Sequence, residues 1–315
     1  MIVVCGEALI DLFVGRPEAG GIATQAVAGG SPFNVALGLA RLGIPSSFLS
    51  TLSQDAFGDF LLMRLQEAGV ETGFVRRVPE STTLSVVAPA AGGHPHYTFH
   101  SQGADRALAA ADLPDLPASV AAIAAGSYAL AVEPSASAIE ALLRREHGRR
   151  VVSLDPNIRP RVIGDLAAFQ PRFEALLASA TIVKASAEDI ELLYGAADPA
   201  AVAQGWLARG PSLVVVTAGP EGATAYFGGR RVARPGLTVD VVDTVGAGDT
   251  FHAALLAHFA ARGMLSVDRL ARLTANEVAA ALDDAAVAAA LTCTRRGADL
   301  PTRADVDGFR AGRGR

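Results

Sequence analysis

The chain has little lysine, few aromatic residues and no long apolar run, and each scarcity excludes a class of protein. Lys184 is the single lysine among 315 residues, and no Gly-x-x-x-x-Gly-Lys-Ser/Thr stretch occurs, which excludes a P-loop nucleotide site. Glycine, proline and charged residues interrupt every apolar run before it reaches the length that spans a membrane. The net charge of −5, the lack of a basic stripe and the few aromatic residues argue against nucleic acid as a partner.

The N-terminus and the two cysteines favour a cytoplasmic protein. The apolar run after Met1 has no basic region before it and turns polar at Glu7, which predicts a first strand and not a signal peptide. Cys5 and Cys293 lie far apart in apolar segments, so we expect free thiols in a reducing compartment.

Strands and helices alternate along most of the chain. The strands are nearly continuous apolar runs, which is typical of a parallel sheet covered on both faces. The sequence therefore predicts an α/β fold with a doubly wound, mostly parallel sheet and helices on both faces. We expect strands at residues 2–5, 48–52, 128–132, 151–154, 181–183 and 213–216, and helices at residues 32–42, 55–68, 137–147, 165–178, 187–194, 199–209, 266–282 and 285–292.

Residues 72–103 depart from this alternation. They form short alternating strands around the Gly92-Gly93 turn, with no helix between them. Together with residues 12–29, we expect them to form a discontinuous β lid on a single domain of residues 1–315. Its exposed strand edges fit a homodimer through the lid sheet, with a monomer as the alternative.

Three histidines in this region leave two interpretations open. His94, His96 and His100 have the even spacing that places side chains on one face of a strand, as a metal site requires. No cluster of carboxylates or cysteines accompanies them, and solvated or interface histidines are the other interpretation.

The stretch Asp243-Thr-Val-Gly-Ala-Gly-Asp249-Thr-Phe-His precedes an apolar helical run and carries the clearest chemical signal. The backbone amides of Gly246, Ala247 and Gly248 can turn toward one point, and the positive end of the helix adds to them, which predicts an anion hole. A carboxylate beside such a hole suits a kinase, where it removes the proton of an attacking hydroxyl. The alternative is that Asp249 only begins a helix after a glycine turn.

A second glycine turn lies near the N-terminus, in Gly29-Gly30-Ser-Pro-Phe-Asn34. We expect Ser31 to be the N-cap of a helix and Pro32 to stand in its first turn. Asn34 either assists this cap or turns its side chain toward a ligand at the glycine turn.

Polar clusters follow three successive strands. Because ligands of open parallel sheets bind beyond the carboxyl ends of the strands, we expect these clusters to meet in one crevice. Each also has a purely structural interpretation: a capping box, a turn, and an ion pair between Asp155 and Arg159. The clusters are Asp155-Pro-Asn-Ile-Arg159, Lys184-Ala-Ser186-Ala-Glu188-Asp189 and Thr217-Ala-Gly219-Pro-Glu-Gly222.

The two glycine motifs together resemble the PfkB (ribokinase-like) family of carbohydrate kinases, and the likeness extends over essentially the whole chain. Gly6-Glu-Ala-Leu-Ile-Asp11, Gly103-Ala-Asp105 and Asp155-Pro-Asn-Ile-Arg159-Pro resemble the fructokinase-like branch. The resemblance implies a ribokinase-like fold with a β lid and the transfer of the γ-phosphoryl group of ATP to a sugar hydroxyl.

The resemblance also implies roles for individual residues. Asp249 would be the general base, with Gly246, Ala247 and Gly248 as the anion hole and Arg159 near the phosphates. Asp11, Gly30 and Asn34 would hold the sugar. The nucleotide would meet Lys184, Ser186, Thr217, Gly219 and Gly222. Glu188 and Asp189 would organise the water shell of Mg²⁺, and Asp243 would serve a monovalent cation such as K⁺.

These expectations favour an ATP- and Mg²⁺-dependent kinase of D-fructose. The alternatives among kinases are a 2-keto-3-deoxygluconate kinase or a ribokinase-like enzyme, and outside them a catalytically silent sugar- or nucleotide-binding protein of the same fold. A nicotinamide-dependent oxidoreductase would need Gly-x-Gly-x-x-Gly after the first strand, where the chain has Cys5-Gly-Glu-Ala-Leu.

Overall fold

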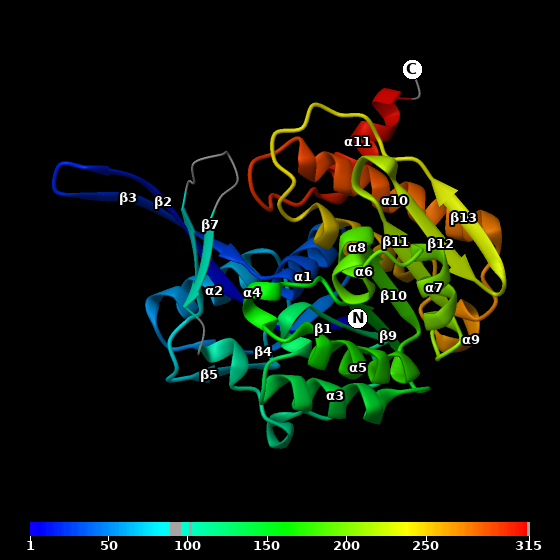
Figure 1. Cartoon of the computed structure of the whole chain (residues 1–315), viewed down its shortest axis with the longest axis horizontal. Coiled ribbons are helices and arrows are strands. Elements are labelled where there is room, and N and C mark those ends of the chain that lie inside the picture. Colours follow the sequence, from blue (N-terminus) through cyan, green and yellow to red (C-terminus); the bar gives the residue numbers. More distant parts are fainter. Residues whose placement is uncertain (89–95, 101–102, 314–315) are drawn as a thin grey trace.

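A computed structural model describes residues 1–88, 96–100 and 103–313, and its centre is a nine-stranded sheet (Figure 1). The strand order is β13-β12-β11-β10-β9-β8-β1-β4-β5; β11–β12 and β12–β13 pair antiparallel and the other neighbours parallel. This confirms the predicted α/β fold with a mostly parallel sheet. The strands are β1 (Ile2–Cys5), β4 (Ser46–Ser53), β5 (Val75–Val78), β8 (Ala122–Gly126), β9 (Val151–Asp155), β10 (Ile182–Ser186), β11 (Leu213–Thr217), β12 (Ala223–Phe227) and β13 (Arg230–Arg234).

Helices cover both faces of this sheet, as predicted. Successive residues of a strand point to opposite faces, so Ile2 and Val4 belong to one buried apolar core and Val3 and Cys5 to the other. The first core also contains side chains of α1, α2, α8, α10 and α11, and the second those of α3, α5, α6 and α7. The helices are α1 (Ser31–Arg41), α2 (Ala56–Glu67), α3 (Ser135–Glu146), α4 (Pro160–Ile163), α5 (Leu166–Leu176), α6 (Ala187–Tyr194), α7 (Pro199–Leu207), α8 (Ala247–Ala261), α9 (Val267–Leu270), α10 (Ala275–Cys293) and α11 (Arg303–Arg313).

A separate four-stranded sheet, in the order β3-β2-β6-β7, stands at one side of the body. The β2–β3 hairpin projects far from the rest of the molecule (Figure 1). The sheet consists of β2 (Leu9–Glu18), β3 (Gly21–Gly29), β6 (Leu84–Ala88) and β7 (His96–His100), with β2 and β6 parallel and the outer pairs antiparallel.

One segment expected in the lid belongs to the large sheet instead. The strand β5 pairs in parallel with β4, Ser50 lying opposite Val75, because α2 carries the chain back across the sheet as a crossover helix. Of the three lid histidines, His94 lies outside the described residues. Among the described residues no group of three or more His, Cys, Asp or Glu could hold a metal ion.

Two other predictions were wrong. The strand expected at residues 128–132 is instead Ala122–Gly126, because burial between β1 and β9 overrides the weak strand propensity of its alanines. The helices expected at residues 266–282 and 285–292 divide at another place: the break lies at residues 271–274, between α9 and α10, and α10 runs unbroken from Ala275 to Cys293. In that helix Asp283 pairs with Arg234 and Asp284 with His258, so the two carboxylates make tertiary contacts and do not end the helix.

No helix within the described ranges is both long and apolar enough to cross a membrane.

Candidate active site

The first turn of α8 presents Asp249 beside a glycine turn. Gly246 is the N-cap with a φ of 79°, and a Cβ there would meet the Ala298 Cβ at 2.8 Å, so the position needs glycine. Its carbonyl accepts from the Thr250 N–H at 2.8 Å, which closes the first helical turn around Asp249. The Asp249 side chain is buried, only 7% exposed.

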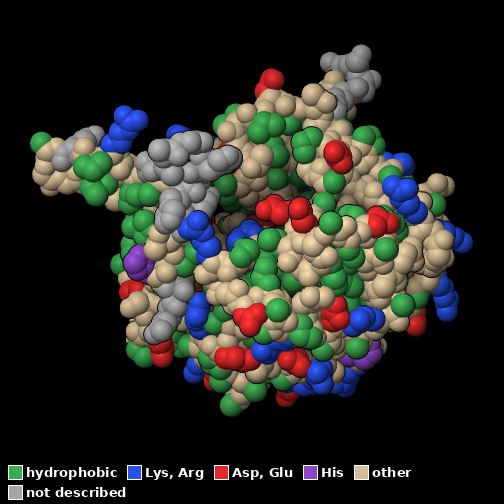
Figure 2. Space-filling view, viewed as in Figure 1, with side chains coloured by type: hydrophobic (Ala, Val, Ile, Leu, Met, Phe, Trp, Pro, Cys, Tyr) green, Lys and Arg blue, Asp and Glu red, His purple; other side chains and the backbone are tan. Residues whose placement is uncertain are grey.

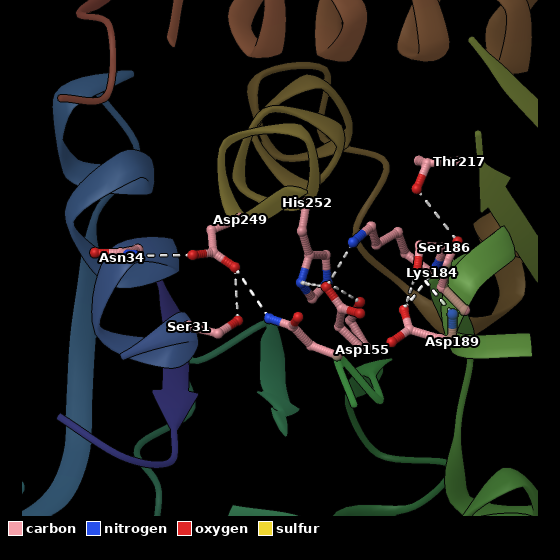
Figure 3. A network of polar contacts seen from close by, with 12 residues as sticks. Ser31, Asn34, Asp155, Lys184, Ser186, Asp189, Thr217, Asp249 and His252 are labelled. Atoms are coloured by element: carbon pink, nitrogen blue, oxygen red, sulfur yellow. Dashed lines mark hydrogen bonds and ion pairs between the residues drawn. The ribbon is translucent and has the colours of Figure 1, made fainter. Parts of the chain in front are cut away.

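Three donors from two other segments hold the Asp249 carboxylate (Figure 3). The Ser31 hydroxyl donates to Oδ1 at 2.7 Å, the Asn34 amide to Oδ2 at 2.8 Å and the Asn157 amide to Oδ1 at 3.3 Å. Hydrogen bonds to a carboxylate are stronger than neutral ones and fix its orientation. Oδ2, which accepts only from Asn34, keeps acceptor capacity for a further hydroxyl.

Ser31 is therefore not the helix cap that the sequence predicts. Gly30 occupies the N-cap with a φ of 108°, and Ser31 is the first helical residue. The Ser31 hydroxyl makes no cap hydrogen bond and donates to the Asp249 carboxylate instead, because a carboxylate oxygen is a strong acceptor. Asn34 likewise faces Asp249 and does not assist a cap.

The backbone amides at this turn are only partly available to an anion. The Ala247 N–H donates to the Thr244 carbonyl at 3.2 Å. Within the described ranges, no residue accepts a hydrogen bond from the N–H of Gly246, Gly248 or Asp249. The open donors at the positive end of α8 are thus those of Gly246, Gly248 and Asp249.

A buried ion pair between the last residue of β9 and a residue of β10 lies beside this turn. Lys184 Nζ donates to Asp155 Oδ2 at 2.9 Å, and both side chains are at most 4% exposed. Burial raises the pKa of Asp155 to about 6; Lys184 lowers it, and the Asp189 and Asp249 charges raise it. The ordinary ion pair considered between Asp155 and Arg159 does not form: Arg159 donates to the Ile158 carbonyl at 3.0 Å and its side chain is exposed.

Ser186 and Asp189 form the capping box of α6. The Ser186 hydroxyl accepts from the Asp189 N–H at 2.9 Å, and Asp189 Oδ2 accepts from the Ser186 N–H at 2.8 Å. Asp189 Oδ1 accepts from the Ile158 N–H at 2.7 Å, which joins α6 to the loop after β9. Protein donors thus engage both Asp189 oxygens, whereas the neighbouring Glu188 is exposed. Direct Mg²⁺ ligation by Asp189 does not fit this arrangement, but contact between Glu188 and a hydrated Mg²⁺ does, because Mg²⁺ keeps several of its waters.

The segment after β11 is a tight glycine turn. The Ala218 N–H donates to the Gly222 carbonyl at 2.8 Å, and Gly219 and Gly222 have φ angles of 52° and 101°. A Cβ on Gly222 would overlap the Arg234 carbonyl, whereas one on Gly219 would meet nothing within 4 Å. Thr217 points back to the Ala185 carbonyl at 3.4 Å.

The predicted sugar-binding residues lie where β2 and α1 begin. A Cβ on Gly30 would lie 2.7 Å from the Glu7 carbonyl oxygen, so the glycine allows close backbone contact there. Burial raises the pKa of Asp11, and the Arg159 charge lowers it in part. The Arg159 guanidinium is therefore close enough to Asp11 for its charge to act on that carboxyl.

Asp243 joins two loops. Its Oδ1 accepts from the Val245 N–H at 3.1 Å and its Oδ2 from the Gly297 N–H at 2.9 Å. The carboxylate thus connects the glycine turn before α8 to the loop after α10.

The molecular surface is hollowed between the small sheet and the body, with acidic and basic side chains at the rim (Figure 2). A carboxylate held by three donors, open amides at a helix start and a buried ammonium therefore lie close together beyond the sheet strands. Such a site activates a hydroxyl and stabilises an anionic group at the same time, which defines a phosphotransferase.

Comparison with known proteins agrees. Residues 1–305 match the pfkB family carbohydrate kinases, and the chain belongs to this family. It is 40% identical over 274 residues to a fructokinase of Rhizobium leguminosarum bv. trifolii, covering 87% of this chain and 84% of that one. It is 36% identical over 314 residues to a fructokinase of Klebsiella pneumoniae, covering 97% of both chains. The structure of Xylella fastidiosa fructokinase with bound ATP superposes with a TM-score of 0.91 at 29% identity, covering 100% of this chain and 99% of the other.

Sequence reasoning missed several residues of the site. Asn157 and Ser31 contact Asp249. The sequence assigns no role to Asn157 and predicts that Ser31 is a helix cap. His252 and Asp155 lie beside Lys184, and Glu7 is buried next to Gly30. The spacing of His252, three residues after Asp249 in one helix, was the available signal for its shared face.

Proposed function

We propose that the protein is an ATP-dependent fructokinase. The observation that carries the proposal is Asp249, a carboxylate oriented by Ser31, Asn34 and Asn157 beside open amides at the start of α8. The choice of fructose is supported by relatives named fructokinase, two of which are described above. A Vibrio cholerae fructokinase solved with fructose, ADP and potassium ion also superposes, with a TM-score of 0.84 at 27% identity, covering 98% of this chain and 97% of the other.

In this proposal the sugar lies between β2 and the start of α1. Asp11 and the backbone at Gly30 orient its hydroxyls, and Asn34 fixes the carboxylate that the reacting hydroxyl meets. Asp249 takes the proton as the oxygen attacks phosphorus in line. The open amides of Gly246 and Gly248, with Lys184 and Arg159, stabilise the charge on the transferred group. The small sheet acts as a lid that keeps water from the nucleotide.

ATP is the proposed phosphoryl donor, and its base and ribose lie over the Thr217–Gly222 turn and Ser186. Glu188 would hold the hydrated Mg²⁺ of MgATP through the waters of the ion, and the ion would supply charge neutralisation on the phosphates. Asp189 supports this site through the loop after β9 and not as a ligand. A monovalent cation near Asp243 is also proposed; because N–H donors engage both Asp243 oxygens, as they do those of Asp189, this carboxylate would hold the two loops beside the ion and would not bind the ion through a free oxygen.

The test is ADP release from MgATP with fructose, ribose, tagatose, 2-keto-3-deoxygluconate and nucleosides, in K⁺ and in Na⁺ buffers. Fructose should drive release, and Asp249→Ala should lower turnover at least about a thousandfold while ATP still binds, because the general base is lost. Wild-type-like turnover of Asp249→Ala would refute the mechanism. Release driven by 2-keto-3-deoxygluconate or ribose would replace fructose, and sugar binding without any release would indicate a silent binding protein.

We further propose that the enzyme acts in the cytoplasm, where ATP is supplied, and that it pairs through the small sheet. Phe13 and Ile22 on the β2–β3 hairpin are exposed apolar side chains, 40% and 54% accessible, which suits contact with a second copy. Sedimentation velocity of the wild type and of Ile22→Glu distinguishes a dimer from a monomer.

A further inference from the structure

A buried polar group lies beneath the start of α8 (Figure 3). It consists of Ser153, Asp155, Lys184 and His252, none of which is more than 3% exposed. His252 Nε2 lies 2.7 Å from the Ser153 hydroxyl, and His252 Nδ1 lies 3.9 Å from Asp155 Oδ2, which accepts from Lys184. Of these four residues, only Lys184 has a place in the function proposed above.

The fold brings these side chains together from three elements. Ser153 and Asp155 are two residues apart in β9, so they point to the same face of the sheet. β10 pairs with β9 in parallel, with Val183 opposite Leu154, and the next residue along β10 is Lys184. His252 follows Asp249 by three residues in α8, so one helix face carries both side chains. The helix face that presents Asp249 therefore rests on this buried group.

Burying the Lys184 ammonium at this position costs free energy unless nearby charges compensate for it. A Cβ on Gly248 would lie 3.3 Å from Lys184 Nζ, so the ammonium is next to the positive end of α8, where a cation is disfavoured. Burial acts to lower the pKa of Lys184, but the charges of Asp155, Asp189 and Asp249 outweigh burial and raise it. Burial lowers the pKa of His252 to about 3, and the Lys184 charge contributes a smaller part of this shift. The His252 ring is therefore neutral at physiological pH and adds no competing positive charge.

The four side chains leave some of their hydrogen-bond donors and acceptors unpaired. An ammonium has three donors, and within the described ranges only Asp155 accepts from Lys184. Asp155 Oδ1 is buried and has no hydrogen-bond partner in the part of the chain that the structure describes, and Asp155, His252 and Ser31 line a cavity of about 10 Å³. The remaining Lys184 donors are therefore available to a group at Gly248, where the backbone amides are open as well.

We propose that Asp155, supported by His252, is a positioning residue that fixes the Lys184 ammonium against Gly248, where it meets the charge developing on the transferred phosphoryl group. The proposal rests on the kinase function proposed above and extends it to two residues that do not touch either substrate. It places their effect on turnover and not on substrate affinity, because the charge on phosphorus oxygens grows during transfer.

The kinetic test is a cycle of Asp155→Asn, Lys184→Met and the double variant. Asp155→Asn should lower kcat about tenfold to a hundredfold and change KM for MgATP and fructose less than about threefold. In the Lys184→Met background the same change should lower kcat by less than about threefold, because Asp155 acts through Lys184. Independent, multiplying losses in the cycle would overturn the proposal, and so would a loss seen only in KM.

A matched control separates positioning from stability. Asp284 is another largely buried carboxylate beside a histidine, accepting from His258 at 2.8 Å between α8 and α10. Asp284→Asn should lower the melting temperature and leave kcat unchanged at temperatures where the protein stays folded. An equal loss of kcat in Asp284→Asn and Asp155→Asn would show that Asp155 is merely structural.

The single lysine allows a second test that does not need turnover. Protein labelled with ¹⁵Nζ-lysine should give one ammonium signal, which Mg²⁺-bound AMP-PNP shifts in the wild type. In Asp155→Asn the ammonium is no longer held, so the signal should broaden or move before nucleotide is added. A signal identical in the two proteins, or one that nucleotide leaves unmoved in the wild type, would overturn the proposal. Lack of turnover with every sugar would refute only the kinase function.

Discussion

The buried carboxyl of Glu7 makes a strong prediction about how stability depends on pH. Glu7 follows β1, is 1% exposed, and its Oε2 has no hydrogen-bond partner among the described residues. Burial raises its pKa from 4.5 to about 8; the Ser127 hydroxyl lowers it in part, and the nearby Asp105 charge raises it. The folded protein therefore holds a proton on Glu7 at pH values where the unfolded chain has lost it.

The sign and size of the effect follow from this difference. Below pH 4.5 both states are protonated, and the contribution of Glu7 to stability is fully present. As the pH rises toward 8, the unfolded state releases the proton first, so the free energy of unfolding falls. At about 1.4 kcal/mol for each pKa unit, the shift corresponds to a loss of at most about 5 kcal/mol. Glu7→Gln keeps the shape and removes the titration.

The assay is urea unfolding of the wild type and Glu7→Gln, followed by circular dichroism from pH 5 to pH 9 at constant ionic strength. The difference between the two profiles isolates Glu7, since all other groups titrate in both proteins. We expect the variant to gain stability relative to the wild type by about 2 to 4 kcal/mol between pH 5 and pH 9. Parallel profiles would contradict a buried, protonated Glu7.

A second buried glutamate provides the control. Glu146 is 3% exposed but pairs with Arg145 at 3.0 Å and Arg150 at 2.8 Å. Glu146→Gln removes the partner of two guanidinium groups and should lose about 3 kcal/mol. One isosteric change should therefore stabilise the protein at high pH, and the other should destabilise it.

Ser31→Ala tests the orientation of the base, and Gly222→Ala, with Gly43→Ala as its control, tests the glycine turn after β11. Ser31→Ala removes the hydroxyl that donates to Asp249 at 2.7 Å, and kcat should fall about tenfold in steady-state assays with the melting temperature little changed; an unchanged kcat would contradict the role given to Ser31. Gly222→Ala should cost at least about 2 kcal/mol in urea unfolding, since the φ is 101° and its Cβ would lie 2.5 Å from the Gly236 nitrogen. Gly43→Ala, at a φ of 78° with nothing within 4 Å, should lose only about 1 kcal/mol, and equal losses would contradict the steric explanation.

The α/β architecture was largely predictable because the local residue preferences and the spacing of apolar residues both indicate it. Apolar runs at 151–154 and 213–216 are strands, and the helices predicted at 32–42 and 55–68 appear as α1 and α2 with bounds that differ by one residue. These features depend on local preferences and on a simple hydrophobic period, so they can be recognised without knowing the tertiary contacts.

The errors arise where tertiary contacts override those local preferences. The Ala-rich strand β8 has weak strand propensity and exists because neighbours bury it on both sides. The Ser31 hydroxyl has a good local role as a cap, but an acceptor 218 positions away is stronger. A short window of sequence contains neither the Asp249 acceptor nor the strands that flank β8, so it cannot reveal these contacts.

The scarcity of lysine acquires a physical meaning from the site. Among the described residues, three side-chain ion pairs do not use arginine: the two histidine pairs and Lys184–Asp155. Every other one does. Arginine offers a broad planar fork, whereas lysine is a compact point charge. Asp155 Oδ2 lies 2.9 Å from Lys184 Nζ, and a Cβ added to Gly248 would lie 3.3 Å from the same nitrogen. The chain therefore places its one ammonium close to both the Asp155 carboxylate and the glycine turn, where a compact point charge fits more easily than a planar guanidinium.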